Sequence, residues 1–314
     1  MSIRGHLWTL APSLRHRLRP LPLPASRPWE TGVADPLRGT VRLTGVLREV
    51  PGSDEILILV HGLGGGSDSH YLSSGVAAAE AAGVSSLRVN LRGADRRGED
   101  FYHAGLTADL HAALASPELQ GYRRAYALGY SLGGHLALRL GTEEGDPRLA
   151  AVAAICSPID LARAQAEIDA PPLWLYRSYL LNGLKDIYDA VAARYPVASP
   201  AVPLPAAAVR RIRSIREWDD RVVAPRHGFA DAADYYARAS VAPRLPALRV
   251  PALLFNSEHD PMVPARAVRA ALDLPAPRLE VRWVAGGGHV AFPRSMGVDG
   301  WVMGWLRGKG RNIR

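Results

Sequence analysis

The residue pattern that most strongly suggests chemistry is a short turn around Ser131. Gly129-Tyr130-Ser131-Leu132-Gly133 matches G-x-S-x-G, and it lies directly between a predicted strand and a predicted helix. In that context the motif forms a sharp turn that projects the serine hydroxyl above a sheet. The helix that begins after the serine favours negative charge developing beside it. We therefore expect Ser131 to be a nucleophile, and a turn of small residues without chemistry is the alternative.

A serine hydroxyl is a weak nucleophile, so it needs a base, and the base needs an orienting acid. After this kind of turn, the acid and then the base follow the serine in chain order. His289 lies in a glycine-rich loop after the last predicted strand, and Asp260 precedes Pro261 after the strand before it. We expect Asp260 and His289 to complete a catalytic triad. Glu258 and Asp160, which also follow predicted strands, are the alternative acids.

Such a reaction also requires two backbone N–H groups that stabilise the oxyanion. Leu132, the residue after the nucleophile, is expected to supply one of them. The loop His61-Gly62-Leu63-Gly64-Gly65 is expected to supply the other, from Leu63. This loop lacks the Lys and the Ser or Thr of a phosphate-binding P-loop. His61 is expected to brace the loop rather than to join the triad.

The elements that position these residues alternate between short apolar strands and helices. Strands are predicted at 55–60, 86–90, 124–128, 151–155, 252–256 and 279–284, and helices at 71–82, 103–114, 132–140 and 298–306. A run such as Glu55 to Val60 is typical of a strand that is buried on both faces. Strands that alternate with helices imply crossover connections and a mostly parallel sheet. The predicted fold class is therefore α/β.

Four segments are predicted along the chain. They are a Pro- and Arg-rich N-terminal arm (1–35), the first part of the sheet domain (36–159), an inserted helical cap (160–246) and the second part of the sheet domain (247–314). A long insertion at this edge of an α/β sheet overlies the ligand crevice. Trp174, Tyr176, Tyr179 and Leu180, near helical spacing in the cap, are expected to offer an apolar surface to an acyl chain.

Composition excludes several classes of protein. The 314 residues are 48% hydrophobic and 22% charged, as in a globular protein, and no apolar run is long enough for a membrane span. The one cysteine, Cys156, excludes an intramolecular disulfide, and the absence of a Cys/His cluster with zinc spacing excludes a zinc module. The expected triad chemistry needs neither a metal nor an organic cofactor. The net charge is +8, but only Lys185 and Lys309 are lysines, which favours compositional bias over a nucleic-acid surface. Because no secretory signal is recognisable, a cytoplasmic location is expected.

The sequence also resembles the YheT-like branch of the α/β-hydrolase superfamily, a group of esterases related to lipases and medium-chain ethyl ester hydrolases. The similarity runs from about residue 55 to 295, in the family's order. It includes His61-Gly62-Leu63, Arg92-Gly93, Tyr102-His103-Ala104-Gly105, Gly129 to Gly134, Tyr179 to Asn182, Arg216 to Asp220, His227-Gly228-Phe229, Asp234-Tyr235-Tyr236, Asp260-Pro261 and Gly287 to Phe292. This resemblance implies an α/β-hydrolase fold, with Ser131 as nucleophile, Asp260 as acid and His289 as base.

The expected function is hydrolysis of short- to medium-chain or lipid-like carboxylic esters through an acyl-enzyme on Ser131. Acyl transfer to an alcohol shares the first half-reaction and is an alternative. A non-catalytic protein that retains the fold is disfavoured, because no triad member is missing. A protein that binds a lipid surface through Trp174 and the leucine-rich part of the cap is the third possibility, which would add a peripheral membrane contact. The sequence does not specify an oligomeric state.

Overall fold

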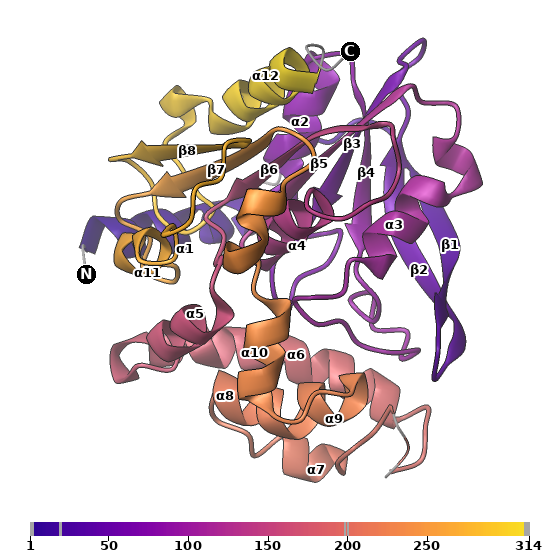
Figure 1. Ribbon diagram of the computed structural model, residues 1–314, viewed down its shortest axis with the longest axis vertical. Coiled ribbons are helices and arrows are strands. Elements are labelled where there is room, and N and C mark those ends of the chain that lie inside the picture. The colour runs from indigo at the N-terminus through magenta and orange to yellow at the C-terminus, as the bar shows by residue number, and fades with distance from the viewer. Residues whose placement is uncertain (1–2, 19–20, 198, 200, 311–314) are drawn as a thin grey trace.

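The computed structural model describes residues 3–18, 21–197, 199 and 201–310, and its centre is an eight-stranded sheet (Figure 1). The strand order is β1-β2-β4-β3-β5-β6-β7-β8. The strands are β1 (Arg27–Asp35), β2 (Gly39–Arg48), β3 (Glu55–Val60), β4 (Ser85–Asn90), β5 (Arg124–Tyr130), β6 (Leu149–Ile155), β7 (Ala252–Ser257) and β8 (Leu279–Val284). Strands β3 to β8 pair in parallel, and β1 and β2 extend the sheet antiparallel.

Helices surround this sheet and form a separate layer at one end of it. The α-helices are α1 (Ile3–Leu18), α2 (Leu72–Ala81), α3 (Ala108–Ala115), α4 (Leu132–Leu140), α5 (Leu161–Ile168), α6 (Trp174–Ala192), α7 (Ala206–Val209), α8 (Ile215–Trp218), α9 (Ala224–His227), α10 (Ala232–Ala239), α11 (Ala265–Arg269) and α12 (Val298–Gly310). Short helical turns are η1 (Pro117–Leu119), η2 (Pro171–Leu173), η3 (Asp219–Val223), η4 (Ala242–Ala247) and η5 (Arg294–Met296). The α/β prediction is confirmed.

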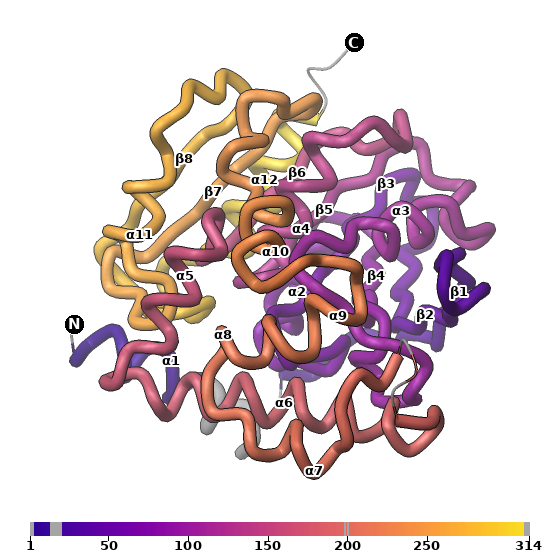
Figure 2. The backbone as a smooth tube through the Cα atoms, turned by 60° about the horizontal axis from the view of Figure 1, so that its bottom comes forward, coloured from indigo at the N-terminus to yellow at the C-terminus, as the bar shows by residue number. Residues whose placement is uncertain are grey.

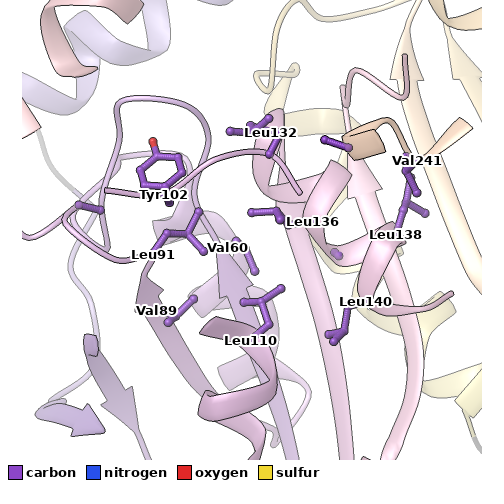
Figure 3. Packing of buried hydrophobic residues seen from close by; sticks show 14 of the residues in the cluster. Val60, Val89, Leu91, Tyr102, Leu110, Leu132, Leu136, Leu138, Leu140 and Val241 are labelled. Carbon is purple, nitrogen blue, oxygen red and sulfur yellow. The ribbon is translucent and has the colours of Figure 1, made fainter. Parts of the chain in front are cut away.

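The central strands are buried on both faces, as their continuous apolar runs predict. Along β3, Ile56, Ile58 and Val60 pack into one core, whereas Leu57 and Leu59 pack into the other. Helices α3 and α4 cover the first core, and α2 and α12 cover the second. Figure 3 shows the first of these cores, with side chains of α3 and α4 beside those of the strands. This packing fixes the end of β5, where the G-x-S-x-G turn begins.

The Pro- and Arg-rich arm predicted over residues 1–35 contains regular structure, since its described residues include helix α1 and strand β1. Residues 1–2 and 19–20 of that segment lie outside the described part of the chain. Strand β1 is on the sheet edge, where Pro28 is tolerated because no ladder hydrogen bond is required on the open side. Its Trp29 is buried and donates a hydrogen bond to Ser116 Oγ. Long-range burial therefore outweighs the local turn signals.

The helical cap predicted over residues 160–246 corresponds to α5 through η4, which lie between β6 and β7 in the chain. Figure 1 shows these helices gathered at one end of the sheet. Figure 2 shows the same layer from below, where it includes α6, α8, α9 and α10. Among the helices that the structure describes, none combines the length and the apolar character needed to cross a membrane.

Candidate active site

The turn around Ser131 has the sharp geometry that its glycines predict. Ser131 adopts φ 53° and ψ −123° between β5 and α4, a conformation that non-glycine residues rarely adopt. A Cβ atom at Gly129 would lie 2.0 Å from the Gly133 carbonyl oxygen, and one at Gly133 would lie 2.3 Å from the Val60 carbonyl oxygen. Only glycine fits both positions. The packing therefore maintains a strained serine at the N-terminus of α4, on the wall of a cavity.

Asp260 and His289 come together from two different loops. His289 Nδ1 lies 2.8 Å from Asp260 Oδ2, and both side chains are buried. The other carboxylate oxygen of Asp260 accepts hydrogen bonds from the Met262 and Val263 N–H groups, at 2.8 and 2.9 Å. These bonds fix the carboxylate and, through it, the imidazole. His289 lines the same cavity as Ser131.

The two alternative acids, Glu258 and Asp160, interact with residues other than His289. Glu258 forms an ion pair with Arg269 at 2.5 Å on the surface. Asp160 caps the N-terminus of α5 by accepting from the Arg163 N–H at 3.0 Å, and its other oxygen pairs with the Arg163 guanidinium. In the described part of the chain, neither carboxylate forms a hydrogen bond or an ion pair with His289. The geometry favours Asp260 as the partner of the imidazole.

The loop that follows β3 leaves one backbone donor available. The N–H of Gly62 donates to the Tyr71 hydroxyl at 2.8 Å, and that of Gly64 donates to the Tyr102 hydroxyl at 2.7 Å. Within the described part of the chain, the N–H of Leu63 between them has no hydrogen-bond partner. Leu63 and Leu132 both line the cavity that contains Ser131. The two residues predicted for the oxyanion hole are thus beside the candidate nucleophile.

His61 braces this loop, as its position predicted. Its Nδ1 lies 2.8 Å from the Gly62 carbonyl oxygen, and its Nε2 accepts from the Leu91 N–H at 3.2 Å. Full burial lowers the pKa of His61 to about 4. The ring is therefore neutral at physiological pH, and the prediction that it remains outside the triad agrees with its contacts.

The cavity beside Ser131 has a volume of about 100 Å³ and lies between the sheet and the cap. Apart from the residues already placed in it, its walls are mostly apolar and come from both parts of the molecule. They include Leu161, Ala164, Ile168, Leu180, Leu184, Ile215, Trp218, Val223, Tyr235, Met262 and Val263. Such a cavity, apolar with a few polar groups at one point, is typical of a small-molecule site.

The cap contributes to the cavity differently from the prediction. Leu180 lines it, but Tyr176 does not, and its hydroxyl instead lies 2.8 Å from His6 Nδ1 of α1. Trp174 and Tyr179 are exposed to solvent. The helical spacing was right, but α6 turns these aromatic side chains away from the cavity. Periodicity groups residues on a face without specifying what the face packs against.

The sequence analysis did not single out Asp219 as a functional residue, although it lies in the Arg216–Asp220 segment of the family resemblance. Asp219 begins η3, lines the cavity and accepts a hydrogen bond from the Tyr236 hydroxyl at 2.7 Å. Burial raises the pKa of Asp219 to about 8. At neutral pH the cavity therefore contains a protonated carboxylic acid.

This raised pKa predicts how Asp219 affects stability. The folded protein binds the proton of Asp219 more tightly than the unfolded chain does, in which the pKa of this carboxyl is 3.8. The contribution of Asp219 to the free energy of unfolding therefore falls as the pH rises from about 4 to about 8, by about 1.4 kcal/mol per pH unit. Above the pKa of the folded state this contribution is constant. We expect Asp219→Asn to raise the melting temperature increasingly as the pH rises from 5 to 8. Thermal unfolding of both proteins tests this, with Asp220→Asn as the control, and parallel pH curves would contradict it.

A second residue that the sequence did not reveal is Thr9 in α1. Its Oγ1 accepts a hydrogen bond from the His289 N–H at 2.9 Å, although the two residues are 280 positions apart. A Cβ atom at Gly288 would lie 2.3 Å from the Gly5 carbonyl oxygen, so α1 packs directly on the loop that carries the histidine. No local signal could identify this contact. Helix α1 is part of the wall that positions His289.

A buried ionic cluster joins the cap to the sheet domain. Arg92 pairs with Asp109 at 2.7 Å and with Asp35 at 2.7 Å. Arg226 of α9 pairs with Asp100 at 2.5 Å and with Asp35 at 3.3 Å. Removal of one member would leave a buried charge without compensation, which is strongly destabilising. The cluster therefore holds the cap in a defined position over the cavity.

No metal site is evident among the described residues, because no group of three or more His, Cys, Asp and Glu side chains is arranged to bind an ion. Cys156 is buried after β6, and burial raises the pKa of its thiol well above the usual range. The prediction that it is a core residue is confirmed. Among the described residues, those with polar side chains that line the cavity are Tyr102, His103, Ser131, Gln165, Asp219, Tyr235, Tyr236 and His289.

Comparisons with known proteins agree with this geometry. Residues 57–298 match the model of the alpha/beta hydrolase family. The chain is 34% identical to YheT of Escherichia coli (strain K12) over 242 residues, which are 75% of this chain and 70% of YheT. It is 28% identical to the medium-chain fatty acid ethyl ester synthase/esterase 2 of Saccharomyces cerevisiae over 66% of this chain, and 27% identical to human phospholipase ABHD3 over 75% of it. The matched regions are 51% and 58% of those two relatives.

Solved structures show the same fold at lower sequence identity. The esterase Pf2001 of Pyrococcus furiosus superimposes with a TM-score of 0.55 over 91% of both chains, at 17% identity. A thermophilic esterase of Thermogutta terrifontis gives a TM-score of 0.53 over 90% of this chain and 99% of its own, at 18% identity. Together with the sheet order, the family match over most of the chain and the similarity to YheT, these results establish that the protein belongs to the α/β-hydrolase family, in its YheT-like branch.

Proposed function

We propose that this α/β hydrolase is a serine esterase in which Ser131, His289 and Asp260 form the catalytic triad. The observation that carries the proposal is the joint placement of Ser131 and a buried, carboxylate-bound His289 on one cavity. The sharp turn of Ser131 and the unpartnered Leu63 N–H support it. The esterase relatives are consistent with the class of reaction.

In this mechanism the Ser131 hydroxyl attacks the ester carbonyl carbon and transfers its proton to His289 Nε2. The Nδ1–H of His289 remains hydrogen-bonded to Asp260, which stabilises the imidazolium that forms. The backbone N–H groups of Leu63 and Leu132 stabilise the negative oxygen of the tetrahedral intermediate. His289 then protonates the departing alkoxide, leaving an acyl group on Ser131. A water molecule deprotonated by His289 releases the acid and regenerates the serine.

The residues that line the cavity support a proposed substrate class. Residues from α5, α6 and α8 give the cap side of the cavity an apolar surface, which suits an acyl chain and not a charged group. Each buried methylene group stabilises binding by about 0.8 kcal/mol, so kcat/KM is expected to rise about fourfold per added carbon until the cavity is full. The yeast relative named for medium-chain fatty acid ethyl esters agrees with this class. We propose short- to medium-chain or lipid-like carboxylic esters as substrates.

A change in cavity size should therefore change the preferred acyl length. We expect Leu180→Trp to shorten the optimum by about two or more carbons, because the larger ring occupies space that the chain would fill. A series of p-nitrophenyl esters from acetate to decanoate measures the profile. Ser178→Trp, on the exposed side of the same helix, is the matched control and should keep the wild-type optimum. If Leu180→Trp keeps the wild-type profile while folding normally, the acyl chain binds elsewhere.

A further inference from the structure

Helix α1 presents its apolar residues to solvent and its small residues to the protein. Ile3, Leu7 and Leu10 are spaced to form one stripe, and Ile3 and Leu7 are 78% and 62% exposed. The opposite side carries Gly5 and Thr9, which contact the loops of His259 and His289. A surface helix of a globular protein normally directs its apolar stripe inward. The reversed orientation of α1 indicates that the stripe has a partner outside the chain.

A second group of exposed apolar residues lies beside α1, at the start of α6. Trp174 is 56% exposed, Tyr179 is 69% exposed, and Leu175 lies between them. His6 of α1 stacks on the Tyr176 ring with the centroids 5.6 Å apart, and the hydrogen bond between them joins the two helices. Figure 2 shows α1 next to this part of the cap. Exposed apolar groups gathered in this way mark interaction sites.

The sequences of α1 and of the start of α6 contain few acidic residues. Helix α1 contains Arg4, which is exposed, and the sequence of the helix contains no Asp or Glu. No Asp or Glu occurs from 170 to 185 either, and Arg177 in this range pairs with Asp169 at 4.0 Å. The whole chain has a net charge of +8. This surface therefore suits a partner with an apolar interior and an anionic surface.

We propose that this surface, formed by Ile3, Leu7, Leu10, Trp174, Leu175 and Tyr179 and here called the α1/α6 face, docks onto an anionic lipid bilayer. Leucine and isoleucine side chains would enter the acyl region, and tryptophan and tyrosine prefer the interface between acyl chains and headgroups. Arginine side chains would meet the lipid phosphates. A protein partner needs complementary hydrogen bonds at its rim, whereas a bilayer matches this combination of apolar, aromatic and basic residues.

Docking in this orientation would bring the lipid surface close to the candidate active site. Leu180, the neighbour of Tyr179 in α6, lines the cavity, and Thr9 of α1 holds the loop of His289. The same two helices therefore contact both the proposed membrane and the site. The proposal concerns binding alone and does not depend on the proposed ester hydrolysis, so Ser131→Ala should bind lipid as the wild type does.

Co-sedimentation with vesicles tests the docking surface directly. Wild type, the double variant Leu7→Glu/Trp174→Glu and the control Leu37→Glu are mixed with vesicles of phosphatidylcholine and phosphatidylglycerol in about a 2:1 ratio. Leu37 is 60% exposed, in the hairpin between β1 and β2, so the control adds one of the two negative charges to an exposed apolar side chain outside the α1/α6 face. We expect the bound fraction of the double variant to fall about tenfold or more, and that of the control to equal the wild type. Circular dichroism and thermal unfolding identify folded variants, and Ile3→Ser and Leu175→Ser serve if the double variant does not fold.

The other outcomes overturn the proposal. Equal binding by the double variant and the wild type would place the lipid contact elsewhere, and lack of binding by the wild type would exclude docking on such a bilayer. Sedimentation velocity without vesicles distinguishes a second copy of the chain as the partner. A wild-type dimer that the double variant converts to a monomer would make the α1/α6 face a dimer interface instead. Binding to phosphatidylcholine alone at the same strength would show that the basic residues do not contribute.

Discussion

Ser131→Ala is expected to lower kcat/KM for a soluble ester by about four to six orders of magnitude. The variant retains the cavity and the backbone donors of Leu63 and Leu132, so the residual rate reports the oxyanion hole and binding alone. The strained conformation of the turn is imposed by the surrounding packing, and alanine adopts it at no greater cost than serine. We therefore expect the melting temperature to stay close to that of the wild type. Initial rates and thermal unfolding measure the two quantities.

The matched control for this variant is Ser178→Ala, which removes an exposed hydroxyl from α6. It should keep the full activity of the wild type. An alanine variant of Ser131 that remains folded and active within about tenfold of the wild type would rule out this serine as the nucleophile.

Asp260→Asn is the second change with a large expected effect, and it separates the two carboxylates of the same loop. An amide at this position can present an N–H to His289 Nδ1, which favours the wrong tautomer, so kcat should fall by about three to four orders of magnitude. Glu258→Gln removes only the surface ion pair with Arg269 and should change kcat less than about twofold. Steady-state kinetics with one soluble ester compares the two variants.

Stability measurements show whether a loss of activity results from a loss of folding. Both variants should unfold cooperatively, as the wild type does, because asparagine keeps the oxygen that accepts from the Met262 and Val263 N–H groups. The assignment of the acid would move to Glu258 if its glutamine variant lost activity while Asp260→Asn remained near the wild-type rate.

The central strands could be predicted from the sequence, and the structure brings Asp260 next to His289 and places His289 on the same cavity as Ser131. β3, β5 and β7 are continuous apolar runs because both of their faces are covered, and such runs are recognisable without a structure. The turn at Ser131 is equally local, since its glycines are required by contacts within the turn and with β3. Asp260 and His289 could be proposed because each follows a predicted strand, in the chain order that accompanies this kind of turn.

The parts that could not be predicted depend on contacts between distant segments. Strand β1 includes Pro28, a residue that argues against a strand until a position on the sheet edge is known. The hydrogen bond from His289 to Thr9 joins opposite ends of the chain. The raised pKa of Asp219 results from its burial within the cap, and the outward direction of Tyr179 results from how α6 lies on the sheet domain. Local patterns carry no information about any of these.

The central claim, an acyl-enzyme on Ser131, is tested most directly by locating a covalent adduct. A fluorophosphonate reacts with an activated serine, and trypsin digestion should then release the peptide 125–139, in which Ser131 is the single serine. Mass spectrometry of the labelled wild-type protein should find one adduct, on that peptide and on that residue. An adduct on a different peptide, or full enzymatic activity in protein whose Ser131 has been labelled, would contradict the account.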